Sequence, residues 1–223
     1  MSNAKKEKFY ERWMQKVHDQ PDGKYQIFDK FIALYIIYNF LYVEAFRLMQ
    51  NENSPSIKRE YRQENQDKST QNSSRFPDEL AATRYIIDFL GGAKEFCHTM
   101  KLDGSQTRDD LNNLRQLVNR DQRNVVKLTR PFKFKICLDS FTGEGDLEAD
   151  KKLAESLLKD NKQELALAVL KMIYQVRCNL FHGRKGLDTP ENSAKPQDLL
   201  KPLCSILEDL VEELFSKLKK EWQ

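Results

Sequence analysis

Glycine and proline are scarce in this sequence of 223 residues, which contains 8 of the first and 7 of the second. Sandwiches and barrels need many tight turns, and such turns depend on both residue types. The scarcity therefore argues against an all-β fold. The hydrophobic fraction of 39% and the charged fraction of 32% suit a chain of amphipathic elements around a sizeable core.

Metal-binding spacings are also missing. No two of the four cysteines form a C-x-x-C pair, and the three histidines are scattered, so no zinc site is predicted. No acidic cluster indicates a site for a hard cation. Isolated cysteines are typical of free thiols in a reducing compartment. We therefore expect neither a metal nor another cofactor, and four free thiols: Cys97, Cys137, Cys178 and Cys204.

No signal peptide or long apolar run is visible. The first residues are polar, and the most apolar run, residues 31–43, has 13 residues. A membrane-spanning helix needs about 20 apolar residues. We therefore interpret this run as part of a buried helix and predict a cytoplasmic protein that has no membrane partner.

Apolar residues recur every three or four positions over much of the chain, which predicts helices. The expected helices cover residues 5–19, 26–50, 77–100, 107–118, 147–159 and 163–181. A final helix follows, and Pro202 confines its start to the 198–202 region. Gly91 and Gly92 predict a kink or a close helix crossing. The prediction is an all-α, up-and-down helical bundle that forms a single domain over residues 1–223.

Two stretches depart from the helical pattern. Residues 51–75 are rich in Asn, Gln, Ser, Glu and Lys with almost no aliphatic residues, which predicts a disordered, mobile polar insert. Residues 131–138 alternate apolar side chains with lysine and cysteine, which predicts a short extended segment.

One polar residue, Asn39, lies in the middle of the most apolar helix. If it is buried, it needs a hydrogen-bond partner. Pairing within the core is the favoured interpretation, and a role at a functional site is the alternative.

Residues that can do chemistry gather at the end of the helix expected at 163–181. Arg177 precedes His182 by five positions, Asn179 lies between them, and Phe181 and Gly183 flank the histidine. The helix is expected to end at Gly183, a favoured C-terminal capping residue.

This Arg-x-x-x-x-His arrangement, with Asn179, Phe181 and Gly183, resembles the signature of the HEPN superfamily (higher eukaryotes and prokaryotes nucleotide-binding). These helical domains include many metal-independent ribonucleases. The resemblance implies a HEPN-type bundle, a defence or toxin endoribonuclease, and catalysis by Arg177, His182 and Asn179. It also implies a homodimer, because sites in this superfamily commonly form at a helical dimer interface.

The same resemblance allows for a cognate antitoxin or a nucleotidyltransferase partner. Some HEPN toxins that pair with nucleotidyltransferase antitoxins carry a tyrosine two residues after the histidine. This chain has Arg184 there, so that mode of control is not supported.

The chemistry of these residue types suits RNA cleavage. An arginine offers a planar, permanently charged fork that matches a phosphate, and a histidine moves protons near neutral pH. His182 would activate the neighbouring 2′-hydroxyl or protonate the leaving oxygen, while Arg177 would stabilise charge on the phosphoryl group.

The spacing places Arg177 and His182 on different faces if the helix continues through both. Positions five apart on an ideal helix differ by about 140°. Either the helix ends before His182, or the site is completed across a two-fold dimer in which two Arg and two His approach one another.

Basic residues elsewhere supply candidate RNA contacts. The net charge of +3 does not by itself indicate a nucleic-acid partner, but residues 120–135 hold six basic residues against one acid, a local charge of +5. The candidate RNA-binding residues are Arg184, Lys185, Arg120, Arg123, Lys127 and Arg130.

The alternative function is a non-catalytic HEPN-like module that binds RNA, a nucleotide or a partner protein. In that interpretation Arg177 pairs with an acid and His182 merely occupies a helix end. Both interpretations explain the basic stretch, and only the first requires His182.

Overall fold

The computed structural model describes residues 1–19, 26–51, 78–103, 107–116, 147–181 and 194–222. These residues are helical apart from short turns, and the described part contains no strand. The all-α prediction is therefore confirmed. The predicted extended segment at 131–138 lies outside the described residues, and so does nearly all of the predicted polar insert at 51–75. The exception is Asn51, which is the last residue of a helix and not the start of the insert.

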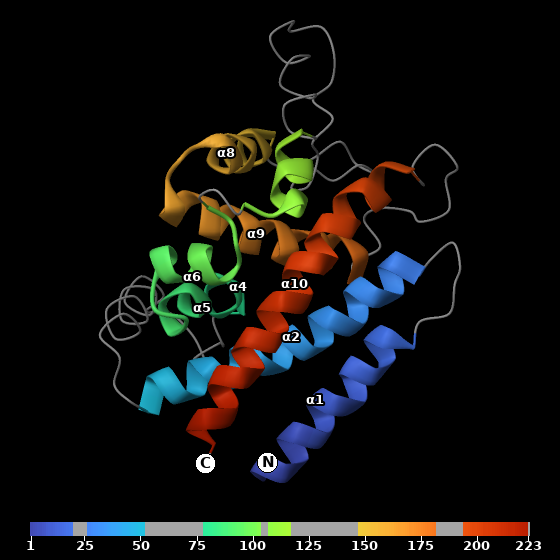
Figure 1. Ribbon diagram of the computed structural model, residues 1–223, viewed down its shortest axis with the longest axis vertical. Coiled ribbons are helices and arrows are strands. Elements are labelled where there is room, and N and C mark those ends of the chain that lie inside the picture. The colour runs from blue at the N-terminus through green and yellow to red at the C-terminus, as the bar shows by residue number, and fades with distance from the viewer. Residues whose placement is uncertain (20–25, 52–77, 104–106, 117–146, 182–193, 223) are drawn as a thin grey trace, which may run out of the picture.

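The first two helices are those that the sequence predicts, within two residues. Helix α1 covers Asn3–His18 and helix α2 covers Gln26–Asn51. They run antiparallel, and α2 passes through the middle of the molecule (Figure 1). Leu34, Ile37 and Leu41 of α2 are fully buried, because apolar residues surround nearly its whole circumference.

By length and composition alone, α2 could cross a membrane, but 61% of its most apolar window is buried inside the protein. Its packing is that of a core helix, as the sequence predicts for residues 31–43. The helices α1 and α10 lie against it (Figure 1).

The helix expected at 77–100 is divided into three. Helix α4 covers Asp78–Ala82, α5 covers Arg84–Phe89 and α6 covers Ala93–Thr99. Gly91 and Gly92 have φ angles of 103° and 93°, a region that side chains with a Cβ rarely adopt. The predicted kink is therefore a complete break, which lets α6 pack against the helix at 162–181.

The remaining helices form the other half of the core. A short helix covers 109–116, and α8 (Leu147–Leu158) packs against α9 (Lys162–Phe181). Helix α10 covers Ala194–Glu221, so the predicted start at 198–202 is wrong. Pro202 lies within this helix, where it removes one N–H donor and crowds the carbonyl of the residue four positions earlier. Packing of α10 along α2 compensates for this loss.

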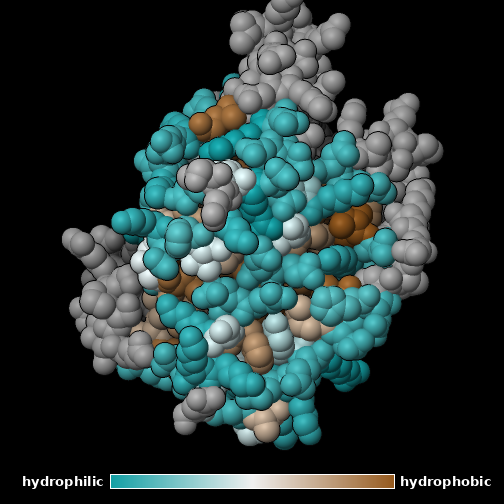
Figure 2. Space-filling model, viewed as in Figure 1, coloured by the Kyte–Doolittle hydropathy of each residue, from teal (hydrophilic) through white to brown (hydrophobic). Residues whose placement is uncertain are grey.

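The buried residues form one hydrophobic cluster that all the labelled helices share. The two chain ends lie side by side (Figure 1), where the Asn3 amide donates a hydrogen bond to the Trp222 carbonyl. Lys219 and Glu7 form an ion pair at 3.3 Å nearby. On the face in Figure 2, hydrophilic residues dominate and the apolar areas are small and separate.

Candidate functional site

Helix α9 presents Arg177 one turn before its end. The helix begins at a cap in which the Asn161 side chain accepts hydrogen bonds from the backbone N–H groups of Gln163 and Glu164, at 3.0 and 3.1 Å. Its buried side, which includes Val169 and Ile173, anchors it in the core. The apolar periodicity therefore determines which way Arg177 faces.

Four side chains surround the Arg177 guanidinium group. Its Nη1 lies 4.0 Å from Oδ2 of Asp78. Its central carbon lies 5.4 Å from the Tyr35 ring centroid, 5.9 Å from that of Tyr174 and 5.3 Å from that of Phe181. Distances of this size allow cation–π attraction. The Arg177 side chain keeps 26% of its area exposed. We call these five residues the Arg177 cluster.

Asp78 is held by two tyrosine hydroxyl groups. The Tyr174 hydroxyl donates to Oδ2 at 3.1 Å, and the Tyr42 hydroxyl donates to Oδ1. Asp78 opens α4, Tyr42 lies on α2 and Tyr174 lies on α9, so the carboxylate joins three helices. This arrangement fixes the acid beside Arg177.

Asn39 corrects one expectation. It is exposed rather than buried, and its Oδ1 lies within hydrogen-bonding reach of the Tyr42 hydroxyl. Pairing within the core is therefore not its role. It lies at the edge of the Arg177 cluster, because Tyr42 also contacts Asp78.

Burial determines the protonation of the tyrosines. It raises the pKa of Tyr35, Tyr42 and Tyr174 above the usual value of a phenol. The hydroxyl groups of Tyr42 and Tyr174 therefore stay protonated well above neutral pH and remain donors to Asp78. For Arg177, burial alone would lower the pKa, but the hydrogen bond from Nη1 to the Cys178 sulfur at 3.7 Å and the neighbouring groups raise it overall.

One nitrogen of Arg177 is left without a partner. Its Nε is buried and makes no hydrogen bond within the described part of the chain. A buried donor that lacks an acceptor is costly, so its presence at Arg177 calls for a structural or functional explanation. The cluster therefore combines a fixed positive charge, partial exposure and an unused donor.

Most of the predicted site residues lie outside the described residues. Helix α9 ends at Phe181, one residue before His182, so the angle between Arg177 and His182 stays a prediction. Asn179 lies in α9, but its side chain is not described. The remaining predicted residues, Arg184, Lys185, Arg120, Arg123, Lys127 and Arg130, also lie outside the described ranges.

Sequence reasoning did not find Asp78, Tyr35 or Tyr174. Asp78 lies in the first turn of α4, at the start of the helix that the sequence predicts from residue 77. Tyr174 lies three positions before Arg177 and so shares its face of α9, a spacing that could have indicated the contact. Tyr35 and Asp78 could not be found this way, because their proximity to Arg177 depends on how three helices pack.

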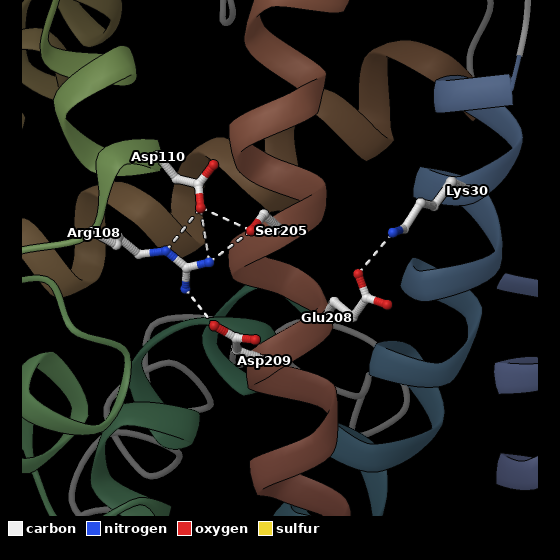
Figure 3. Close-up of polar contacts among 6 residues, drawn as sticks. All are labelled: Lys30, Arg108, Asp110, Ser205, Glu208 and Asp209. Carbon is white, nitrogen blue, oxygen red and sulfur yellow. Dashed lines mark hydrogen bonds and ion pairs between the residues drawn. The ribbon is translucent and has the colours of Figure 1, made fainter. Parts of the chain in front are cut away.

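A second polar cluster lies at a different place. Arg108 precedes the helix at 109–116 and contacts three residues (Figure 3). Its Nη1 lies 2.7 Å from Asp209, its Nε lies 3.0 Å from Asp110, and its Nη2 donates to the Ser205 hydroxyl at 2.7 Å. Ser205 in turn donates to Asp110 at 2.8 Å. All three guanidinium nitrogens take part in these contacts, so the cluster joins α10 to the neighbouring helix as a structural link.

The Arg177 cluster is the better candidate for a functional site. It offers a partly exposed cation that can bind a phosphate or another anion, next to aromatic rings. Within the described ranges, no group of three or more His, Cys, Asp or Glu residues could hold a metal ion. No family model, no curated protein and no solved structure matches this chain.

Proposed function

We propose that the protein is a metal-independent endoribonuclease of the HEPN type, a defence or toxin component that cleaves RNA by attack of the neighbouring 2′-hydroxyl. The observation that carries the proposal is the state of Arg177: partly exposed, fixed by Asp78 and three rings, and with a buried Nε that lacks a partner among the described residues. The exposed part of the guanidinium group can donate charge-assisted hydrogen bonds to a phosphate oxygen.

In this proposal Arg177 binds the scissile phosphate and stabilises the charge that develops on it. His182 moves the proton of the 2′-hydroxyl or of the leaving oxygen. Asp78 does not touch the substrate. It holds the guanidinium fork in place, with the hydroxyl groups of Tyr42 and Tyr174 fixing the carboxylate.

The direct test is cleavage of single-stranded RNA by the purified protein. We expect a product that ends in a 2′,3′-cyclic phosphate, no cleavage at a 2′-deoxy position, and a rate that a chelator does not change. His182→Ala should lower the rate by about a hundredfold or more, because a positioned acid or base supplies at least this factor. Cleavage that survives in His182→Ala would remove the nuclease assignment.

Arg177 needs two variants, because its side chain also packs against aromatic rings. Arg177→Ala loses charge and packing together, whereas Arg177→Lys keeps the charge and loses the fork. Both should cleave far more slowly than the wild type. Arg12→Ala, which removes an exposed arginine of α1, is the matched control and should cleave normally. Circular dichroism melts identify any variant that fails to fold.

We further propose that the protein acts as a homodimer with its Arg177–His182 segments facing each other. The support is the separation of about 140° expected for positions five apart on a helix, which leaves one chain poorly placed to complete the site. Light scattering at micromolar concentration, with and without RNA, should give twice the mass of one chain. A monomer under both conditions contradicts the dimer.

A second candidate function is a module that binds RNA without cutting it. One observation favours it: Arg177 already contacts Asp78 and three rings, as a structural arginine would. A non-catalytic module predicts that the wild type binds RNA, cuts none, and loses no affinity on His182→Ala.

A further inference from the structure

Phe181 is the outermost ring of the Arg177 cluster. It is 52% exposed, and the only other large apolar side chain with comparable exposure in the described part of the chain is Met1, at the chain start. The other rings near Arg177 are more enclosed: Tyr35 is 2% exposed and Tyr174 is half-buried. Phe181 is therefore the ring of the Arg177 cluster that is most accessible to a ligand.

The positions of Arg177 and Phe181 suit a nucleotide. They lie four positions apart on α9, so they share one face about one turn apart, with 5.3 Å between the guanidinium carbon and the ring centroid. A phosphate and the base of the same nucleotide are likewise separated by one sugar. A cation and an exposed ring side by side form the usual platform for single-stranded nucleic acid.

We propose that Phe181 stacks on the nucleobase next to the phosphate that Arg177 binds, and that the protein therefore takes single-stranded RNA with an unstacked base at this position. The proposal rests on the proposed function, because it needs RNA at Arg177. Stacking on a ring tolerates every base, since each has a π face. The contact therefore selects unpaired RNA over a duplex, in which both faces of each base are already covered.

The test measures binding by fluorescence anisotropy with full-length protein that carries His182→Ala, so that the RNA stays intact. The probes are a labelled single-stranded RNA of mixed sequence, the same backbone without bases, and the matching duplex. Phe181→Leu should bind the base-containing single strand about tenfold more weakly, the size of effect typical of base–aromatic stacking. Phe181→Trp should bind it at least as well as the parent protein.

The probe without bases separates stacking from structural damage. On it, and on the duplex, Phe181→Leu should bind as the parent does. Phe89→Leu is the control, because Phe89 is a partly buried ring beside a cation, 5.2 Å from the Lys217 Nζ, and lies outside the Arg177 cluster. It should bind all three probes normally.

Three results would overturn the stacking proposal. The first is unchanged affinity of Phe181→Leu for the base-containing strand, and the second is an equal loss of affinity for the strand without bases. The third is that Phe181→Leu becomes a monomer in light scattering, which would assign the ring to a contact between two copies of the protein. Failure of the nuclease proposal looks different: the wild type would not cut RNA although the base-dependent loss remains.

Discussion

Arg177 and Asp78, which are far apart in the sequence, approach each other with 4.0 Å between Nη1 and Oδ2. The pair is weak as an ion pair at this distance and degree of exposure. Its importance lies in geometry. Asp78 accepts hydrogen bonds from Tyr42 and Tyr174, and burial raises the pKa of both hydroxyl groups, so they remain donors far into the alkaline range. Asp78 is therefore held in place by the two tyrosines and lies beside the Arg177 guanidinium group.

Asp78→Asn tests this positioning. The amide keeps one acceptor oxygen but loses the charge and one of the two tyrosine bonds, so we expect the free energy of unfolding to fall by about 1 kcal/mol. If the proposed function is correct, RNA cleavage should fall about tenfold or more, because the guanidinium fork is no longer held in one place. Asp88→Asn, at an exposed aspartate of α5, is the control. Normal cleavage by Asp78→Asn would show that Asp78 does not position Arg177.

The contacts of Arg108 predict that two arginines differ in how much they contribute to the free energy of unfolding. Arg108 is 10% exposed and contacts Asp110, Asp209 and Ser205, whereas Arg47 is 66% exposed and contacts only Glu44 in the described contacts. Arg108→Gln should lower the free energy of unfolding by about 2 kcal/mol, and Arg47→Gln by less than about 1 kcal/mol. Urea unfolding measures both. Equal losses would show that the Arg108 contacts add nothing beyond a surface pair.

Alkaline pH should destabilise the protein through its buried thiols. Burial raises the pKa of Cys97 to about 11 and that of Cys204 to about 12, whereas an unfolded thiol has a pKa of about 8.5. Above that value the unfolded chain loses thiol protons first, so the free energy of unfolding falls as pH rises, and below it the stabilisation is fully present. Urea unfolding from about pH 8 to about pH 10 should show this fall.

The matched control for the alkaline effect is the double variant Cys97→Ala, Cys204→Ala. It removes the two thiols with a raised pKa, so its free energy of unfolding should change less with pH over the same interval. An identical slope in the wild type and the double variant would show that the two thiols do not titrate differently on unfolding.

The basic stretch at 120–135, which lies outside the described residues, is predicted to bind RNA without sequence preference. Replacing Arg123, Lys127 and Arg130 with Gln should weaken binding equally for unrelated RNAs and lower the slope of log affinity against log salt by up to about two. Replacing the exposed α1 residues Lys5, Lys8 and Arg12 removes the same charge and is the control. Equal effects of the two triple variants would show that only net charge matters.

The local pattern of apolar and capping residues was sufficient to predict most of the helices. Helical periodicity and capping residues act between neighbours along the chain, so the ranges predicted for α1, α2 and α9 agree with those observed to within two residues. The same logic failed at Pro202, where contacts between α10 and α2 outweigh a local preference to begin the helix at the proline. It also failed at Thr83, where the helix expected at 77–100 is interrupted, whereas at Gly91 and Gly92 it predicted a kink and the structure has a break.

The sequence by itself identified Arg177 as a candidate, because its spacing from His182 and its position near a helix end are local features. Only the tertiary structure revealed Asp78 and Tyr35 beside it, and the exposure of Asn39 and Phe181. The physical reason is that these contacts join α2, α4 and α9, and which faces of three helices meet is decided by how their apolar surfaces pack together.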